Sequence, residues 1–237
     1  MNPYQKLLSR KRKWTPVRTS AGTCVNGSQE TLHRVIALRH LELPVGGFIT
    51  DALATDVPEL ARELLLTNVK DEENHDLALS YIADAYGTDP KAEKEAFLLR
   101  EAWTSHPDHT ILKAMVAERS IFFVLLPFLR FNGDAGMRTV SADISRDEQV
   151  HVAANSIVCK ELNLVASPSL DKLRKATIQW VMEPLGINTN RYLDRKFWTD
   201  SSDRLMYEGK APELSDTRAA RMPAFFEHSN VNLPSYA

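Results

Sequence analysis

Two short stretches of the chain carry residue types that could bind metal ions. Each has a glutamate followed three positions later by a histidine, as Glu72 with His75 and Glu148 with His151. Residues three apart on a helix share one face and lie about 4.5 Å apart along the axis. Each stretch can therefore direct one carboxylate and one imidazole toward a single point.

A further glutamate precedes each stretch at the same interval. Glu42 lies 30 residues before Glu72, and Glu118 lies 30 residues before Glu148. A single Glu-x-x-His pair is typical of a solvated helix face in a chain with 31 acidic residues and 7 histidines. The doubled pattern instead matches four-helix bundles that hold two metal ions, in which two helices each give a glutamate and two each give Glu-x-x-His. The predicted ligands are Glu42, Glu72, His75, Glu118, Glu148 and His151.

The ligand types indicate which metals are expected. Four carboxylates and two imidazoles suit iron or manganese above all, whereas zinc sites more often use cysteine or three histidines. Four carboxylates also balance the charge of two divalent ions in a buried site. We therefore predict two iron ions, or a Mn/Fe or Mn/Mn pair, with coordination positions open for dioxygen. Turnover at such a centre would require an external electron donor.

Two aspartates are candidates for orienting the histidines. A metal-bound histidine usually donates its other ring N–H to a carboxylate or a carbonyl. Asp147 precedes Glu148, and we predict that it orients His75 from the facing helix and so takes part in the active site. Asp71 precedes Glu72 in the same way. For Asp71 a role beside a histidine and a place on the solvated surface both remain open.

The composition favours a helical protein. Only 9 of the 237 residues are glycine and 43% are apolar, which is enough for a substantial core. The 29 basic and 31 acidic residues nearly balance, so we expect no nucleic-acid partner. No run of about 18 apolar residues is present, so no membrane-spanning helix is expected. The two cysteines form no metal motif or disulfide framework, and we expect a cytoplasmic location.

Four long helices are predicted to carry the ligands, over residues 28–53, 56–86, 109–131 and 135–162. Shorter helices over 90–104, after Pro168 and over 189–207 are expected to cover this bundle, so the predicted fold class is all-α. Asp56 is the expected N-cap of the second long helix, and Gly87 its expected end. In the third long helix, Pro127 is expected to kink the last turn.

The ligands are predicted to lie at one level of the bundle. Glu42 and Glu72 lie 12 and 15 residues from a turn at 54–57, and Glu118 and Glu148 each lie 14 residues from a turn at 132–134. Pro44 bears on this argument, because it interrupts the first helix just after Glu42. We expect a kinked helix that continues; termination at Pro44 is the alternative and would weaken the case for Glu42.

The predicted organisation is an irregular N-terminal arm over residues 1–27, a helical domain over 28–208 and an extended C-terminal tail over 209–237. The arm contains a basic run, Arg10–Lys13, followed by Trp14. It could dock an anionic partner, but we favour a solvated segment in which Trp14 is the anchor. In the tail, Phe225 and Phe226 are expected to pack against the body.

Several of these motifs resemble the small subunit of class I ribonucleotide reductase. The residues that carry the resemblance are Arg146-Asp147-Glu148-Gln149-Val150-His151, Glu118 with Phe122-Phe123-Val124, Pro58-Glu59-Leu60, Thr88-Asp89-Pro90 and Phe225-Phe226-Glu227. Together they span about residues 40–228. The resemblance implies a ferritin-like bundle, the six metal ligands named above with Asp147 beside them, and dioxygen activation. It also implies a homodimer and a large catalytic subunit, docked by the C-terminal tail.

The chain departs from that family at the position of the radical-bearing tyrosine. This position lies four residues after the first ligand histidine, where the chain has Leu79, while Tyr81 and Tyr86 are out of register. The chain is also short for such a subunit. The Arg-Asp-Glu-x-x-His motif occurs in other ferritin-like oxygenases as well, including aldehyde-deformylating enzymes. A small-substrate di-iron oxygenase, a ferritin-like iron storage or detoxification protein and a purely structural helical protein therefore remain as alternatives.

Overall fold

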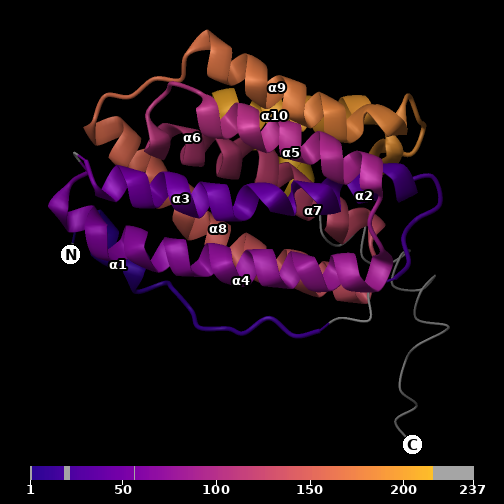
Figure 1. The fold of residues 1–237 in the computed structure, drawn as a ribbon, viewed down its shortest axis with the longest axis horizontal. Helices are drawn as coiled ribbons and strands as arrows, with labels where there is room; N and C mark the ends of the chain where they lie inside the picture. The colour runs from indigo at the N-terminus through magenta and orange to yellow at the C-terminus, as the bar shows by residue number, and fades with distance from the viewer. Residues whose placement is uncertain (1, 19–21, 56, 216–237) are drawn as a thin grey trace, which may run out of the picture.

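Four long helical units form the centre of the fold in a computed structural model, which describes residues 2–18, 22–55 and 57–215 (Figure 1). Helix α3 packs against α4 and α6, and α8 packs against α4, α6 and α7, so the four units close a ring. The units are α2 (Gln29–Ala37), η1 (Leu38–Leu41) and α3 (Glu42–Leu53); α4 (Arg62–Tyr86); α6 (Thr110–Ala117), η3 (Glu118–Phe122) and α7 (Phe123–Asn132); and α8 (Ala135–Glu161). The described residues contain no strand, only an isolated bridge between Cys24 and Gly133. The predicted all-α class is confirmed.

The first unit is the kinked helix that the sequence predicts. The backbone tightens into the 3₁₀ turn η1 and then continues as α3 through Pro44. Pro44 has no N–H to donate to the carbonyl of His40, so the tight turn falls where the regular bond pattern is interrupted. Because the helix does not end at Pro44, Glu42 stays on a helix that faces the bundle interior, and it is fully buried.

Gly46 and Gly47 lie side by side on α3 in different surroundings. A Cβ on Gly46 would lie 3.3 Å from the Cβ of Glu72, whereas a Cβ on Gly47 would meet nothing within 4 Å. Gly46 therefore permits the close approach of α3 to α4 at the level of Glu72.

This difference predicts opposite effects of the two alanine variants. Gly47→Ala should stabilise the protein by about 0.5–1 kcal/mol, because alanine is the better helix former and is unobstructed there. Gly46→Ala should lose that gain, because Glu72 must move by a few tenths of an ångström, and it should also weaken metal binding. Urea unfolding of both variants and a metal titration test this pair; equal stabilisation by both would contradict it.

Helix α4 begins later than predicted. Pro58 has an extended backbone (ψ 134°), the short 3₁₀ turn η2 (Glu59–Ala61) follows, and the α-helix starts at Arg62. The predicted N-cap, Asp56, lies outside the described residues. The predicted end is confirmed, because Gly87 follows Tyr86 with a φ of +98°. Glycine adopts this backbone conformation with less steric strain than any other residue.

The third unit contains a π-helical segment that the sequence does not predict. The segment η3 starts at Glu118, and the α-helix resumes as α7 at Phe123, with Pro127 inside it. The hydroxyl of Ser202, from α10, donates to the carbonyl of Ser120 at 2.7 Å and so satisfies a backbone group of the altered ladder. Single π turns are frequent at functional sites, and this one carries a predicted ligand.

Further helices cover the ring. They are α5 (Pro90–Ser105), α9 (Pro168–Met182) and α10 (Arg195–Glu208), with the short turns η4 (Glu183–Leu185), η5 (Arg191–Leu193) and η6 (Pro212–Ser215). Side chains of Asp89, Asp134 and Ser167 cap α5, α8 and α9. The last helix begins at Arg195 instead of 189, because residues 191–193 form a separate 3₁₀ turn after the Asn190 cap. The expected packing of Phe225 and Phe226 lies outside the described residues.

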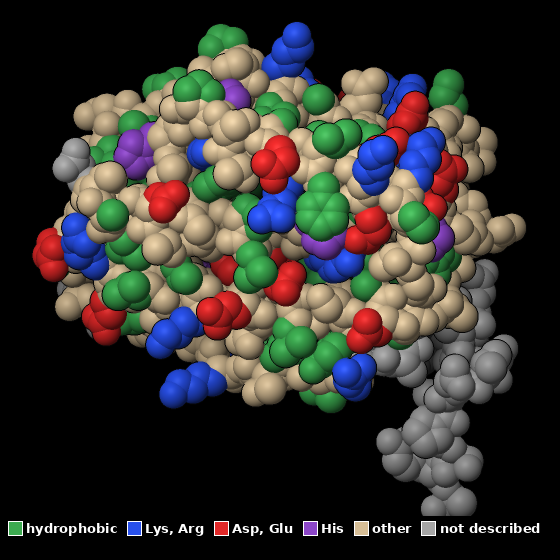
Figure 2. Space-filling view, in the orientation of Figure 1, with side chains coloured by type: hydrophobic (Ala, Val, Ile, Leu, Met, Phe, Trp, Pro, Cys, Tyr) green, Lys and Arg blue, Asp and Glu red, His purple; other side chains and the backbone are tan. Residues whose placement is uncertain are grey.

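The N-terminal arm is not wholly irregular, which corrects the prediction for residues 1–27. Helix α1 (Pro3–Leu8) is capped by the Asn2 side chain, and it packs against α4 and α8. Pro3 suits the first helical position because its missing N–H needs no partner there. No helix in the described ranges is both long and apolar enough to cross a membrane. Acidic and basic side chains are interspersed over the face that Figure 2 shows, as the balanced composition predicts.

Candidate metal centre

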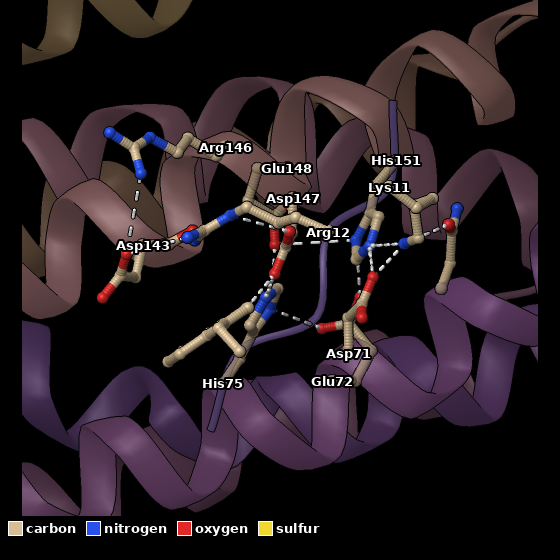
Figure 3. A network of polar contacts seen from close by, with 12 residues as sticks. Lys11, Arg12, Asp71, Glu72, His75, Asp143, Arg146, Asp147, Glu148 and His151 are labelled. Carbon is tan, nitrogen blue, oxygen red and sulfur yellow. Dashed lines mark hydrogen bonds and ion pairs between the residues drawn. The ribbon is translucent and has the colours of Figure 1, made fainter. Parts of the chain in front are cut away.

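The centre of the bundle holds a buried cluster of carboxylates and imidazoles from α4 and α8. Glu72 and His75 lie on α4, and Glu148 and His151 lie on α8 (Figure 3). One ligand atom from each of the four lies within 4.8 Å of the others, and each residue is 0–1% exposed. The two Glu-x-x-His stretches thus meet, and the cluster could hold a pair of metal ions.

Glu42 and Glu118 extend the cluster on opposite sides. An Oε atom of Glu42 lies 3.9 Å from Nδ1 of His75, and one of Glu118 lies 3.8 Å from Nδ1 of His151. Both glutamates are fully buried. The structure therefore brings all six predicted ligands together, with one outer glutamate beside each histidine.

Many polar atoms of the cluster make no hydrogen bond of normal geometry among the described residues, although Nδ1 of each histidine lies 2.9–3.4 Å from glutamate oxygens. They are both carboxylate oxygens of Glu42, Glu72 and Glu148, one oxygen of Glu118, and Nδ1 of His75 and His151. Buried polar groups are nearly always paired, because an unpaired one costs about 1–3 kcal/mol, and more when charged. These atoms are all of the types that bind iron or manganese, and they converge on a common centre. The residues therefore fit a pair of divalent ions.

The outer nitrogen of each histidine contacts an aspartate of the opposite stretch. Nε2 of His75 lies 3.4 Å from Asp147, which precedes Glu148, and Nε2 of His151 lies 3.0 Å from Asp71, which precedes Glu72. The contact predicted for Asp147 is present, and Asp71 has the equivalent place rather than a solvated one. With Nε2 donating outward, Nδ1 of each ring is left to face the cluster.

Burial and repulsion between the glutamates control the ionisation of the cluster. Burial, and then repulsion by Glu72, raises the pKa of Glu42 well above its ordinary value, and burial and Glu148 do the same to the pKa of Glu118. Burial also opposes ionisation of Glu72, but its contacts with His151 and His75 prevail and lower its pKa. Glu42 and Glu118 therefore favour the uncharged form, whereas Glu72 favours the charged form.

Both histidines favour the charged form in the metal-free protein. Burial lowers the pKa of His151, but the Glu148 charge and the contacts with Asp71 and Glu72 outweigh it and raise the pKa to about 10. The pKa of His75 is likewise raised well above its ordinary value, because contacts with Asp147, Glu148 and Glu72 outweigh burial. The protons on the two histidines thus partly neutralise the negative charge of the glutamates, as bound cations would.

The N-terminal arm reaches the two aspartates, which corrects the interpretation of the basic run as solvated for Lys11 and Arg12, while Arg10 and Lys13 are exposed. Lys11 forms an ion pair with Asp71 and lies 3.4 Å from Nε2 of His151 (Figure 3). Trp14 donates its indole N–H to Asp147 at 2.5 Å, and its ring stacks on His75 with 6.3 Å between centroids. The anchoring predicted for Trp14 is confirmed, and its anchor is the site itself.

Asn155 is a further site residue that the sequence reasoning missed. Its side-chain N–H donates to Oε2 of Glu118 at 2.6 Å, and the residue is fully buried. The signal was its position four residues after His151 on α8, which places it one turn along the same face. Asn155 holds the Glu118 carboxylate in one orientation and leaves its other oxygen toward the cluster.

Apolar side chains are also buried next to the ligands along their helices. Val116, Ile121 and Phe122 are buried around Glu118, and Leu79 is buried one turn beyond His75. Tyr81 and Tyr86 make contacts elsewhere, with the guanidinium of Arg18 and the sulfur of Cys24 respectively.

Comparisons of the chain with family models, with curated proteins and with solved structures gave no significant match. The chemistry of the site therefore rests on its own residues.

Proposed function

We propose that this protein is a dioxygen-activating di-metal oxidoreductase with a ferritin-like bundle, similar to the small subunit of ribonucleotide reductase. Its cofactor would be two iron ions, or a Mn/Fe or Mn/Mn pair. The observation that carries the proposal is the buried cluster of four glutamates and two histidines, whose carboxylate oxygens and Nδ1 atoms converge on one centre. Burial of these groups lowers the stability of a helix bundle unless they bind a ligand, so a purely structural role does not explain them.

In this proposal the six ligands divide into two half-sites. His75 and Glu42 would hold one ion, His151 and Glu118 the other, and Glu72 and Glu148 lie between them. The metal pair, when bound, supplies open coordination positions and electrons for the reduction of dioxygen.

The chain's own groups hold these ligands in place. Asp147 and Asp71 keep protons on Nε2 of His75 and His151, so that Nδ1 stays free to bind. Asn155 orients Glu118. The ligands are buried, and burial strengthens the electrostatic interactions among them.

One observation favours a small-substrate oxygenase over a radical-storing reductase subunit. Leu79 stands where the resembling family has its tyrosine, and it is only 5% exposed. An open pocket of about 280 Å³ lies beside the arm, and its lining includes Trp14 and Val140 as well as the charged Arg18 and Asp143. Its volume is near the lower end for small-molecule sites, and Trp14, which lines it, also stacks on His75. A reductase subunit would require a large catalytic partner and a homodimer, whereas an oxygenase would require a small apolar substrate.

Iron loading under controlled oxygen tests the proposal. We expect the protein to bind about two iron(II) ions per chain without air, and to consume dioxygen rapidly with the appearance of ferric absorption when air is admitted. Continued uptake of many more irons per chain would indicate storage instead. No bound iron or manganese would overturn the proposal.

A further inference from the structure

We propose that Lys11 is a positioning residue of the metal centre, and that the N-terminal arm joins the two helices that carry the ligands. This inference rests on the proposed function, because it concerns how the half-site of His151 is held. The arm is remote in sequence from both helices, since Lys11 precedes Asp71 by 60 residues.

Lys11 acts on His151 through Asp71. Its Nζ donates to Oδ2 of Asp71. It also donates to Oδ1 of Asn68, at a distance of 3.0 Å. The same Oδ2 lies 3.0 Å from Nε2 of His151, closer than the 3.4 Å between that nitrogen and Nζ. One carboxylate oxygen thus accepts from the ammonium and from the imidazole together. The lysine side chain is 11% exposed, so water screens this arrangement little.

The residues after Lys11 make the matching contacts on the other helix. Arg12 donates to the side chain of Asp143 at 3.1 Å and to its carbonyl at 2.6 Å, and its guanidinium lies 3.7 Å from Asp147 (Figure 3). Consecutive residues of the arm therefore bond to different helices, Lys11 to α4 and Arg12 to α8. The arm holds these helices at the separation that the ligands require.

The charges of the site support this role. The four glutamates would be balanced by two divalent ions, which leaves Asp71 and Asp147 as buried carboxylates without a metal partner. Lys11 and Arg12 supply one positive charge to each. If Lys11 is removed, Asp71 keeps a buried charge without its cation, and it no longer holds the His151 ring in one orientation.

The contacts predict that Lys11 affects one of the two ions more than the other. Lys11 contacts the half-site of His151, whereas Arg12 and Trp14 contact Asp147 in the half-site of His75. In an anaerobic cobalt(II) titration of the full chain, we expect two binding steps for the wild type. Lys11→Met should weaken one step by about tenfold, the lower end of the range for loss of a direct partner of a ligand, because Lys11 acts through Asp71. The other step should stay within about threefold.

Lys13→Met is the matched control, because Lys13 lies on the same arm and is exposed. It removes the same charge, so both binding steps should stay within about threefold of the wild type. A double variant tests the pathway. In the Asp71→Asn background, Lys11→Met should have little further effect on metal binding, because Lys11 acts through Asp71. Lys11→Arg, which keeps the charge, should restore part of the affinity.

A spectroscopic measurement separates positioning from general stability. In the zinc-loaded protein, which is diamagnetic, the Nε2–H of His151 should be visible by NMR and exchange slowly with water. Lys11→Met should make this exchange at least about tenfold faster while that of His75 is unchanged. A wild type that binds neither cobalt nor zinc would refute the proposed function. A wild type that binds two ions, with Lys11→Met equal to Lys13→Met or weakening both steps alike, would refute only the role of Lys11.

Discussion

Replacement of Glu72 or Glu148 by alanine is expected to remove both metal ions from the protein. Each carboxylate lies between the two histidines: Glu72 oxygens are 2.9 Å and 3.4 Å from Nδ1 of His151 and His75, and Oε1 of Glu148 is 3.8 Å and 3.2 Å from the same two atoms. Loss of either group therefore affects both half-sites. We expect affinity to fall by more than about a hundredfold, beyond the range for a partner of a ligand, and oxygen consumption to cease.

The outer glutamates give a graded comparison. Glu42 lies near His75 and Glu118 near His151, so Glu42→Ala and Glu118→Ala should each retain more metal than the two central variants. Glu73→Ala is the control on α4, because Glu73 is exposed and adjacent to Glu72. Metal analysis after dialysis, with circular dichroism to verify folding, measures these effects. Unchanged iron content in both central variants would refute the site.

Metal binding is expected to stabilise the fold strongly. A ligand at about a thousand times its Kd adds about 4 kcal/mol to the free energy of unfolding, and each kcal/mol raises Tm by about 2–4 °C for a domain of this size. Each ion should therefore raise Tm by roughly 8–16 °C. Calorimetry with manganese(II) and with a chelator measures this shift. The Glu148→Ala variant should show little of it; an equal rise in that variant would mean that the ions bind elsewhere.

The same experiment has a pH dependence of known sign. The pKa of His151 is raised to about 10 in the metal-free fold, so its stabilising charge is fully present below about pH 6.5 and is lost as pH rises toward 10. The raised pKa values of Glu42 and Glu118 act in the same direction, because ionisation of these buried acids also disfavours the fold. Titration of His151 alone should thus cost the metal-free protein about 2 kcal/mol between pH 7 and pH 9. With metal bound the loss should be small, and a Tm that rises with pH in the chelated protein would contradict this account.

The parts of the fold that local chemistry controls could be predicted from the sequence. Asp89 before Pro90, Asp134, and Ser167 before Pro168 are capping signals that act within a few residues, and the helices start where they indicate. Gly87 ends α4 for a similarly local reason. The spacing of the ligands depends only on helical geometry and on turns of known length, so their meeting at one level was also predictable.

The features that the sequence did not reveal depend on distant contacts. A basic run such as Arg10–Lys13 is normally solvated, and only the folded chain shows Lys11 against Asp71 and Arg12 against Asp143. The π segment at Glu118 has no local signal, since a partner from α10, Ser202, takes part in it. Asp71 was undecided for the same reason: its histidine lies 80 residues away.

Each histidine is oriented by an aspartate of the other Glu-x-x-His stretch, and this arrangement has a consequence for biosynthesis. Asp147 serves His75 across 72 residues, and Asp71 serves His151 across 80. A growing chain that has completed α4 but not α8 thus lacks half of the central ligands and the acid that orients its histidine. Under the proposed function, such a chain would bind redox-active metal weakly, and metal uptake would follow the docking of both helix pairs.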